Sequence, residues 1–237
     1  MNTSDYRAGE VLLIDKPYRW SSFQAVNKIK HAIKNHASLV VDGVRTKPKI
    51  GHAGTLDPLA TGLLIVCTGK KTKEINQYMG MDKEYTGTFL LGATTPCYDL
   101  EKPVDHIYPT EHITEALLQK IARDMTGELE QVPPLFSAIM IDGKRAYEYA
   151  RAGEVAEIKS RVITLFEFEL TRIALPEVDF RIVCSKGTYI RSIARDFGLA
   201  AKSGAHLTAL RRTRIGPYRV EDAVSPEWFT VEKNLIL

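Results

Sequence analysis

The sequence has no long hydrophobic run, and this absence excludes a membrane-spanning helix. No apolar stretch approaches the roughly 18 to 20 residues that a span requires, although hydrophobic residues make up 44% of the chain. The first ten residues, MNTSDYRAGE, are polar and include acids, so they lack the pattern of a secretory leader. We therefore expect a cytoplasmic protein with a full apolar core and no membrane partner.

Cysteines are few, and spacings typical of metal ligands are missing. The three cysteines, Cys67, Cys97 and Cys184, are odd in number and far apart, which favours reduced, buried thiols over a disulfide framework. The sequence contains no CxxC or HExxH, and its six histidines are scattered. We therefore predict no metal site.

Acidic residues are absent from residues 197–220, although the net charge of the whole chain is only +3. Between residues 180 and 220, nine Lys and Arg stand against one acid, and between 11 and 81 eleven stand against four. The middle, 82–179, carries a net −8. Two basic segments that meet in the fold would form a face for a polyanion such as nucleic acid. The alternative is two unrelated solvated surfaces.

Apolar periodicity predicts an α+β fold around one largely antiparallel sheet, without a domain boundary in residues 1–237. The expected strands are 11–17, 63–67, 83–92, 137–141, 161–173 and 178–186. The expected helices are 23–34, 72–79, 111–126, 144–153 and 189–201. Residues 205–218 are expected to form a helix followed by a strand, and residues 35–50 a long loop.

The stretch GHAGTLDPLATGLL, residues 51–64, places one carboxylate between a glycine turn and a proline. Pro58 disfavours helical angles at Asp57, and Gly51 and Gly54 permit a tight turn before it. Asp57 is then either a loop-capping group or a reactive group presented at the mouth of a buried strand. A Walker A phosphate loop is excluded, because that motif needs Gly at 64 and Ser or Thr at 71.

The same stretch closely resembles the signature of the TruB family of tRNA pseudouridine synthases. Other blocks resemble the family in its order along the chain: KPYRWSS (16–22), KEYTGTFLLG (83–92), VPPLFSAIMIDGKRAYEYARAG (132–153), SKGTYIRSIARDFG (185–198) and AHLTALRRTRIGPY (205–218). The resemblance therefore covers roughly residues 11–218.

The resemblance implies the pseudouridine synthase core, an extended, mixed and mostly antiparallel sheet flanked by helices and loops. It implies conversion of uridine 55 in the T loop of tRNA to pseudouridine, with the T arm as the bound partner. It also implies an enzyme that needs no cofactor and no metal. We expect a monomer without an obligate protein partner.

Residue roles follow from the resemblance position by position. Asp57 matches the essential catalytic aspartate, and Arg191 the arginine that pairs with it. Tyr85 matches the tyrosine that stacks on the flipped uracil, and His52 the histidine that contacts the RNA. Tyr189 and Leu210 match further pocket positions. Whether Asp57 attacks the base, attacks the sugar or assists deprotonation at C2′ stays open.

Four basic residues of the resembling blocks are expected to hold RNA phosphates. These are Lys16, in the first block, and Arg211, Arg212 and Arg214, in the last. The target base lies inside a folded loop, so it must be flipped out at a cost of a few kcal/mol, which stacking on aromatic side chains offsets.

The chain departs from the family pattern in four places. Met140 stands where a basic residue is common, which removes one possible phosphate contact. Arg19 stands where the first block usually has Gly, so we expect an altered turn. Residues 35–49 look like an extra loop that carries Arg45, Lys47 and Lys49. Only 19 residues follow Tyr218, so we expect no C-terminal RNA-binding domain of the PUA type. The alternative functions are a non-catalytic tRNA-binding or chaperone module, and a pseudouridine synthase that acts on another RNA.

Overall fold

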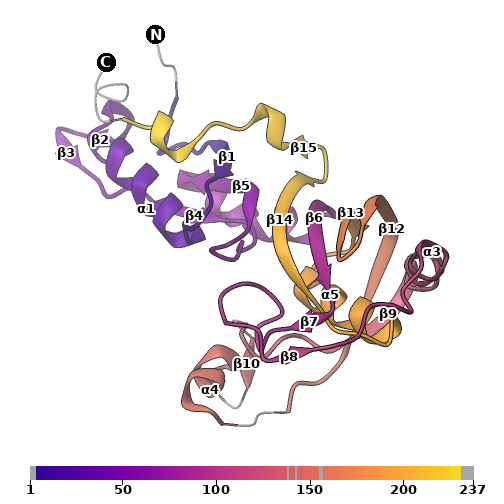
Figure 1. Cartoon of the computed structure of the whole chain (residues 1–237). Helices are drawn as coiled ribbons and strands as arrows, with labels where there is room; N and C mark the ends of the chain where they lie inside the picture. The colour runs from indigo at the N-terminus through magenta and orange to yellow at the C-terminus, as the bar shows by residue number, and fades with distance from the viewer. Residues whose placement is uncertain (1–3, 138, 142, 155–156, 231–237) are drawn as a thin grey trace. The chain divides into compact units, whose positions relative to one another are not determined.

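The computed structural model describes residues 4–137, 139–141, 143–154 and 157–230 (Figure 1). The chain divides into two compact units, which we call unit 1 (residues 1–84 and 211–237) and unit 2 (residues 85–210). Strands β6 (Lys83–Leu91) and β14 (Ala205–Ile215) each have residues in both units. That the whole chain forms one domain stays a prediction. None of the described helices is long and apolar enough to cross a membrane.

Unit 1 is built around β5 (Thr61–Thr68), the apolar strand that follows the Asp57 loop. Strand β1 (Val11–Lys16) pairs antiparallel along its whole length, from Val11 opposite Cys67 to Lys16 opposite Gly62. The other edge of β5 pairs with β4 (Ile50–His52) near its end and, in parallel, with β14 near its start. Because both edges are paired, β5 is a central strand.

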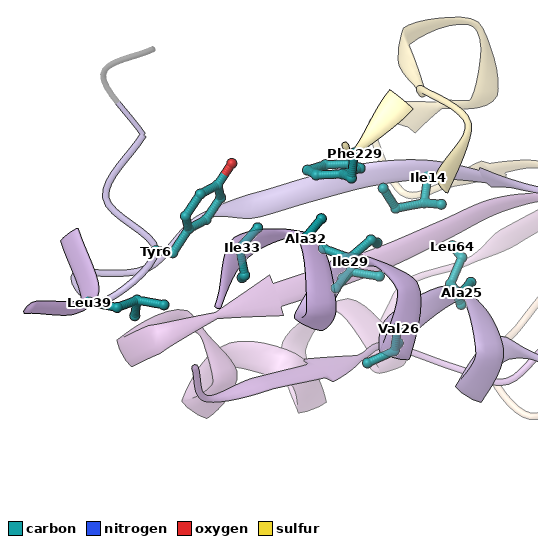
Figure 2. Packing of buried hydrophobic residues seen from close by; sticks show 11 residues of the cluster. Tyr6, Ile14, Ala25, Val26, Ile29, Ala32, Ile33, Leu39, Leu64 and Phe229 are labelled. Atoms are coloured by element: carbon teal, nitrogen blue, oxygen red, sulfur yellow. The ribbon is translucent and has the colours of Figure 1, made fainter. Parts of the chain in front are cut away.

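Both faces of β5 are covered, which explains its uninterrupted run of apolar residues. On one face, Leu64 and Val66 pack against the apolar side of helix α1 (Ser22–Ile33), as Figure 2 shows for Leu64 with Ala25, Ile29 and their neighbours. On the other face, Leu63, Ile65 and Cys67 belong to a second cluster that contains Tyr78. The side chains alternate between the two clusters, as the period of two in a strand requires.

The segment 35–50 is more ordered than the predicted long loop. It contains a 3-10 turn, η1 (Ala37–Leu39), and a small hairpin of β2 (Val40–Val41) and β3 (Val44–Arg45) before β4 begins. The hairpin turn is Asp42-Gly43, and both residues have positive φ, 50° and 76°. This geometry is typical of a two-residue turn whose twist matches the flanking strands.

The remaining parts of unit 1 follow its sheet. The 3-10 turn η2 (Gly69–Glu74) leads into α2 (Ile75–Gly80), where a helix over 72–79 was expected. After β14 come β15 (Tyr218–Arg219), η3 (Val220–Asp222) and η4 (Pro226–Trp228).

Unit 2 contains the long strands that the sequence predicted. In its sheet the strand order is β14, β6, β13 (Glu177–Cys184), β12 (Arg161–Ala174) and β9 (Gly127–Gln131). The β12–β13 hairpin is antiparallel from Leu165 opposite Cys184 to Ala174 opposite Glu177, and β9 pairs antiparallel with β12. The mixed, mostly antiparallel sheet of the predicted α+β class is confirmed.

Aromatic packing holds helix α5 (Ile190–Ala200) on this sheet. Phe89 of β6 stacks on Phe180 of β13 with ring centroids 4.2 Å apart, and Phe197 of α5 lies 5.2 Å from Phe89. Helix α3 (Glu115–Asp124) precedes β9, and the smaller elements are β7 (Ala93–Thr94), β8 (His106–Ile107), β10 (Met140–Ile141), β11 (Lys144–Arg145) and α4 (Ala146–Ala152).

The helix predicted at the start of residues 205–218 is wrong, because β14 is a single strand from Ala205 to Ile215. The segment has good helix formers, but strand pairing overrides this weak preference. Gly87 lets the β14 backbone come close, since a Cβ there would lie 2.4 Å from the Ala209 carbonyl oxygen. The Thr213 hydroxyl also bonds the Glu84 carboxylate at 2.7 Å.

Candidate active site

Asp57 lies half-buried in the loop between β4 and β5 of unit 1. The loop begins where the Ala53 N–H donates to the Ile65 carbonyl, and it closes where the Ala60 N–H donates to the carbonyl of Asp57 itself. Gly54 has a φ of +91°, a conformation that side-chain-bearing residues avoid. The predicted position of Asp57 on a glycine–proline loop before a buried strand is confirmed.

Helix α1 fixes Leu56, the residue before Asp57, through hydrogen bonds. The buried Ser22 hydroxyl donates to the Leu56 carbonyl at 3.1 Å and accepts from the Leu56 N–H at 2.9 Å. Both backbone groups of Leu56 are therefore satisfied by one side chain, which a buried peptide unit requires.

The first block holds the other side of the loop. The Arg19 N–H donates to the Pro58 carbonyl at 2.8 Å, and Arg19 has a φ of 65°. Arg19 thus adopts the left-handed conformation, which costs a glycine less than a residue with a side chain. Its side chain is exposed, and a turn that differs from the family pattern stays a prediction.

Lys16 is fully buried rather than on a surface for phosphates. Its ammonium group donates to the carbonyls of Trp20 at 2.6 Å, Pro17 at 3.0 Å and Pro58 at 3.4 Å. Burial lowers the pKa of Lys16 to about 8, and the negative charge of Asp57 opposes this shift. Lys16 thus anchors the two turns and places a cation in the electrostatic neighbourhood of Asp57.

Arg212 is also buried, with 2% of its surface exposed. Its guanidinium donates to the Leu63 carbonyl at 2.7 Å and to the Gly54 carbonyl at 3.1 Å, so it supports the Asp57 loop from inside. Gly62 is required beside it, because a Cβ there would lie 2.3 Å from the Arg212 carbonyl oxygen. Burial and then the Arg212 charge lower the pKa of His52, which favours a neutral imidazole at the start of the loop.

The remaining arginines of the last block are partly exposed and paired. Arg211 makes two hydrogen bonds to the Asp15 carboxylate, at 2.7 and 3.0 Å, and Arg214 lies 3.9 Å from the Glu84 carboxylate. The sequence pattern predicted that Arg211, Arg212 and Arg214 form one phosphate-binding face. In the structure Arg212 is an internal support, unlike the other two, and RNA contacts by all three stay predictions.

The other predicted pocket residues, Tyr85, Tyr189, Arg191 and Leu210, belong to unit 2. Tyr85 is buried on β6, and Leu210 lies half-buried on β14. The pairing of Asp57 with Arg191 crosses the two units and stays a prediction.

Arg191 is buried at the start of α5, where three groups fix its guanidinium. It donates to the Phe136 carbonyl at 2.9 Å and the Cys97 carbonyl at 3.3 Å, and its Nε lies 3.8 Å from the Asp99 carboxylate. The Tyr189 backbone is held by both atoms of the Gln131 side-chain amide. The start of α5, which carries Tyr189 and Arg191, is thus firmly positioned.

Sequence reasoning missed the supporting groups Ser22, Asp99 and Gln131. Ser22 carried a signal, since two serines stand at the start of the helix and only one can cap it. Asp99 and Gln131 lie in segments without a local sequence pattern. Only the fold brings Asp99 close to Arg191 and Gln131 close to Tyr189. Within the described ranges, no group of three His, Cys, Asp or Glu side chains is placed to hold a metal.

Comparison with known proteins finds matches along nearly the whole chain. The family model described as TruB family pseudouridylate synthase (N terminal domain) matches residues 42–190, and that of the tRNA pseudouridylate synthase B C-terminal domain matches residues 191–233. A protein of Flavobacterium johnsoniae named tRNA pseudouridine synthase B is 61% identical over 94% of this chain and 96% of its own length. One of Phocaeicola vulgatus with the same name is 53% identical, and 94% of each chain is covered.

Solved structures give the same result for the fold. The crystal structure of a Cbf5-Nop10-Gar1 complex contains a chain with a TM-score of 0.67 and 28% identity. The match covers 93% of this chain and 52% of that chain, so the present chain spans about half of its length. With one family model matching more than half of the sequence and relatives above 50% identity, the chain belongs to the TruB family of pseudouridylate synthases.

Proposed function

We propose that this chain converts the uridine at position 55 in the T loop of tRNA to pseudouridine, with Asp57 as the catalytic carboxylate. The observation that carries the proposal is the Asp57 loop, which is fixed by the Ser22 hydroxyl, the Arg19 N–H and the Arg212 guanidinium. A carboxylate held on a rigid loop meets its substrate without a cost of reorganisation. The names of the relatives supply the tRNA substrate.

The reaction is an isomerisation, so it consumes no second substrate. The bond from N1 of uracil to C1′ of the ribose breaks, the base turns, and a bond from C5 to C1′ forms. C5 then loses its proton and N1 gains one. Asp57 either forms a covalent intermediate with base or sugar, or removes a proton at C2′; each role requires an ionised carboxylate next to the target nucleotide.

Unit 2 supplies the proposed partners of this carboxylate. Tyr85 stacks on the flipped uracil, with Tyr189 and Leu210 at the same base, and Arg191 pairs with Asp57 when the substrate is bound. His52 contacts the RNA beside the target. Stacking offsets part of the free energy that is needed to flip the base out of its loop.

The test is to incubate the protein with unmodified tRNA transcript and to map pseudouridine by position. We expect modification at position 55 alone, and none with Asp57→Asn, which keeps the shape and removes the charge. Asp42→Asn is the matched control, because it removes a carboxylate from the exposed β2–β3 turn where Asn tolerates the same backbone. Substantial turnover by Asp57→Asn contradicts the proposed role.

The same experiment separates the two alternatives. A non-catalytic tRNA-binding or chaperone module would bind the transcript and leave every uridine unmodified. A synthase for another RNA would leave this tRNA unmodified and act on a different transcript in a mixture of cellular RNAs.

We further propose that the enzyme acts in the cytoplasm as a monomer, without a cofactor or an obligate protein partner. In support, Cys67, Cys97 and Cys184 are buried thiols that form no disulfide, as expected for a reducing compartment. Nop10 and Gar1 are components of the Cbf5 complex, and that association is a property of Cbf5. Light scattering on the purified, active protein should give the mass of one chain, 26.6 kDa.

A further inference from the structure

A cleft of about 220 Å³ in unit 1 is lined by cationic side chains that the Asp57 loop does not use. These are Arg7, Lys47, Lys49, Lys70 and Lys73, which we call the basic cleft. We infer that the basic cleft binds backbone phosphates of a double-stranded stem of the substrate RNA, outside the loop that holds the target base. The inference rests on the proposed function, because it assigns a second part of the same substrate.

The five charges are available to a ligand. All five side chains are exposed, and in the part of the chain that the structure describes none of them forms an ion pair. The cleft lining contains no Asp or Glu. The contrast is Lys71, which is paired with Glu74 at 2.9 Å and does not line the cleft. Several like charges at one site repel each other, so a polyanion relieves the repulsion and releases its own counterions.

Three segments far apart in the sequence build the cleft, and backbone contacts fix them. The Gly69 N–H donates to the Lys49 carbonyl at 2.9 Å, and the Lys70 N–H donates to the Ala8 carbonyl at 3.2 Å. The backbone of Arg7 passes so close that a Cβ on Gly69 would lie 2.2 Å from its carbonyl oxygen. The cations are therefore held together by the fold and are not a chance cluster on one flexible loop.

The position of the basic cleft sets which part of an RNA reaches it. Lys49 and Gly69 pair at one end of the β4–β5 hairpin, and Asp57 lies in the loop at the other end. The eight residues of β5 cover about 23 Å. A single nucleotide bound at Asp57 cannot span this distance, so the phosphates in the cleft must come from neighbouring structure.

The length of helix α1 gives a second, independent measure of the distance between the Asp57 loop and the basic cleft. Ser22 at its start touches the Asp57 loop, while Leu39, shortly after its end, lines the basic cleft. Twelve helical residues rise about 18 Å. Figure 2 shows Tyr6 and Leu39 at one end of the α1 cluster and Ala25 at the other. Both lengths place the basic cleft too far from Asp57 for contact with the target nucleotide, so the phosphates in the cleft belong to a neighbouring stem.

The residue types favour a nucleic-acid backbone over a small phosphate ligand. Four of the five cations are lysines, which act as flexible point charges. A small phosphate ligand is typically held by fixed, bidentate donors, which the cleft offers only through Arg7. Phosphate contacts of this kind position an RNA and do not read its sequence. The cleft therefore fits recognition of a stem by its charge.

The test compares two triple variants of the full chain. Lys47→Gln, Lys49→Gln and Lys73→Gln together neutralise the basic cleft. Lys28→Gln, Lys30→Gln and Lys159→Gln remove three exposed lysines elsewhere and serve as the matched control. Binding of unmodified tRNA is measured by fluorescence anisotropy across a salt series, and pseudouridine formation is measured on the same RNA.

We expect the cleft variant to bind tRNA at least tenfold more weakly at physiological salt. The slope of log affinity against log salt should flatten by up to about 2 to 3, because each duplex contact contributes about 0.9 and each single-stranded contact about 0.7. The loss in pseudouridine formation should fall on KM more than on kcat. Replacing the same three residues by Arg should restore binding.

The outcomes distinguish this inference from the proposed function. If wild type modifies tRNA and the cleft variant has the slope and affinity of the control variant, the inference is overturned. If wild type makes no pseudouridine but the slope difference is present, the proposed function fails while the RNA-binding cleft stands. A cleft variant that loses binding only because it unfolds shows a lowered melting temperature and fails to recover with Arg.

Discussion

The Ser22 hydroxyl makes two hydrogen bonds to the backbone of Leu56, the residue that precedes Asp57. Ser21, one residue earlier, caps helix α1 through the Gln24 N–H. The two adjacent serines therefore have different roles: Ser21 caps the start of the helix, and Ser22 bonds the helix to the Asp57 loop. The Asp57 loop of unit 1 is thus fixed by a helix whose own start is capped separately.

We expect Ser22→Ala to lower the free energy of unfolding by about 1 to 3 kcal/mol, because it leaves a buried N–H and carbonyl unpaired. Turnover at saturating tRNA should also fall, since Asp57 loses its fixed position. Ser21→Ala is the control: loss of the cap costs about 1 kcal/mol without touching Leu56. Equal turnover in the two variants would contradict a positioning role for Ser22.

The buried Lys16 makes stability depend on pH above neutrality. Burial lowers its pKa to about 8, from 10.5 in the unfolded chain. Below about pH 8 both states hold the proton, and the cost of burying the cation is fully present. Between about 8 and 10.5 the unfolded chain binds more protons than the folded one, so this residue makes the free energy of unfolding rise with pH.

Urea unfolding of wild type and Lys16→Met between pH 7 and 10 measures this effect. The unfolding free energy of wild type minus that of Lys16→Met should increase by up to about 1.4 kcal/mol per pH unit above pH 8. Lys16→Arg keeps its proton throughout this range and is the control. Parallel curves for wild type and Lys16→Met would show that the buried ammonium does not titrate there.

Much of the fold could be predicted from local patterns in the sequence. The β12–β13 hairpin, helix α1 and the Asp57 loop are encoded by alternation, helical periodicity and glycine–proline chemistry within short windows. The β2–β3 hairpin also carries a local signal, Asp42-Gly43, inside the segment expected to be a loop. Here the physical information is present in the sequence, and the interpretation missed it.

Other features could not be predicted, because they depend on residues far apart in the chain. The strand conformation of Ala205–Ile215 comes from its neighbours in the sheet and opposes its own helical preference. The burial of Arg212 depends on carbonyls of Leu63 and Gly54, some 150 residues earlier. An arginine in a basic run is usually solvated, and only the fold shows this one inside.

Arg19 stores backbone strain at the turn that holds Pro58. Its φ of 65° costs a residue with a side chain about 1 kcal/mol, which glycine does not incur. We therefore expect Arg19→Gly to be more stable than Arg19→Ala by about 1 kcal/mol in urea unfolding. Both variants lose the guanidinium, so their difference isolates the Cβ. An Ala variant as stable as the Gly variant would mean that the turn is not left-handed in solution.

The two adjacent arginines of β14 should differ when each is replaced by Ala. Arg212 is buried and bonded to two loop carbonyls, so Arg212→Ala leaves a cavity and unpaired acceptors and should cost about 2 to 4 kcal/mol. Arg211 is partly exposed and paired with Asp15, and Arg211→Ala should cost less than about 1 kcal/mol.

The same pair separates support of the loop from contact with RNA. Arg212→Ala should reduce turnover at saturating tRNA even at temperatures where the variant is fully folded, because the carbonyl of Gly54 loses its partner and the Asp57 loop loosens. Its salt dependence of tRNA binding should match wild type, since a buried guanidinium releases no counterion from a phosphate. If Arg212→Ala instead flattens the salt slope by about 0.7 to 0.9 while turnover at saturation is preserved, Arg212 reaches a phosphate when tRNA binds, and its assignment to the RNA-binding face from the sequence is correct.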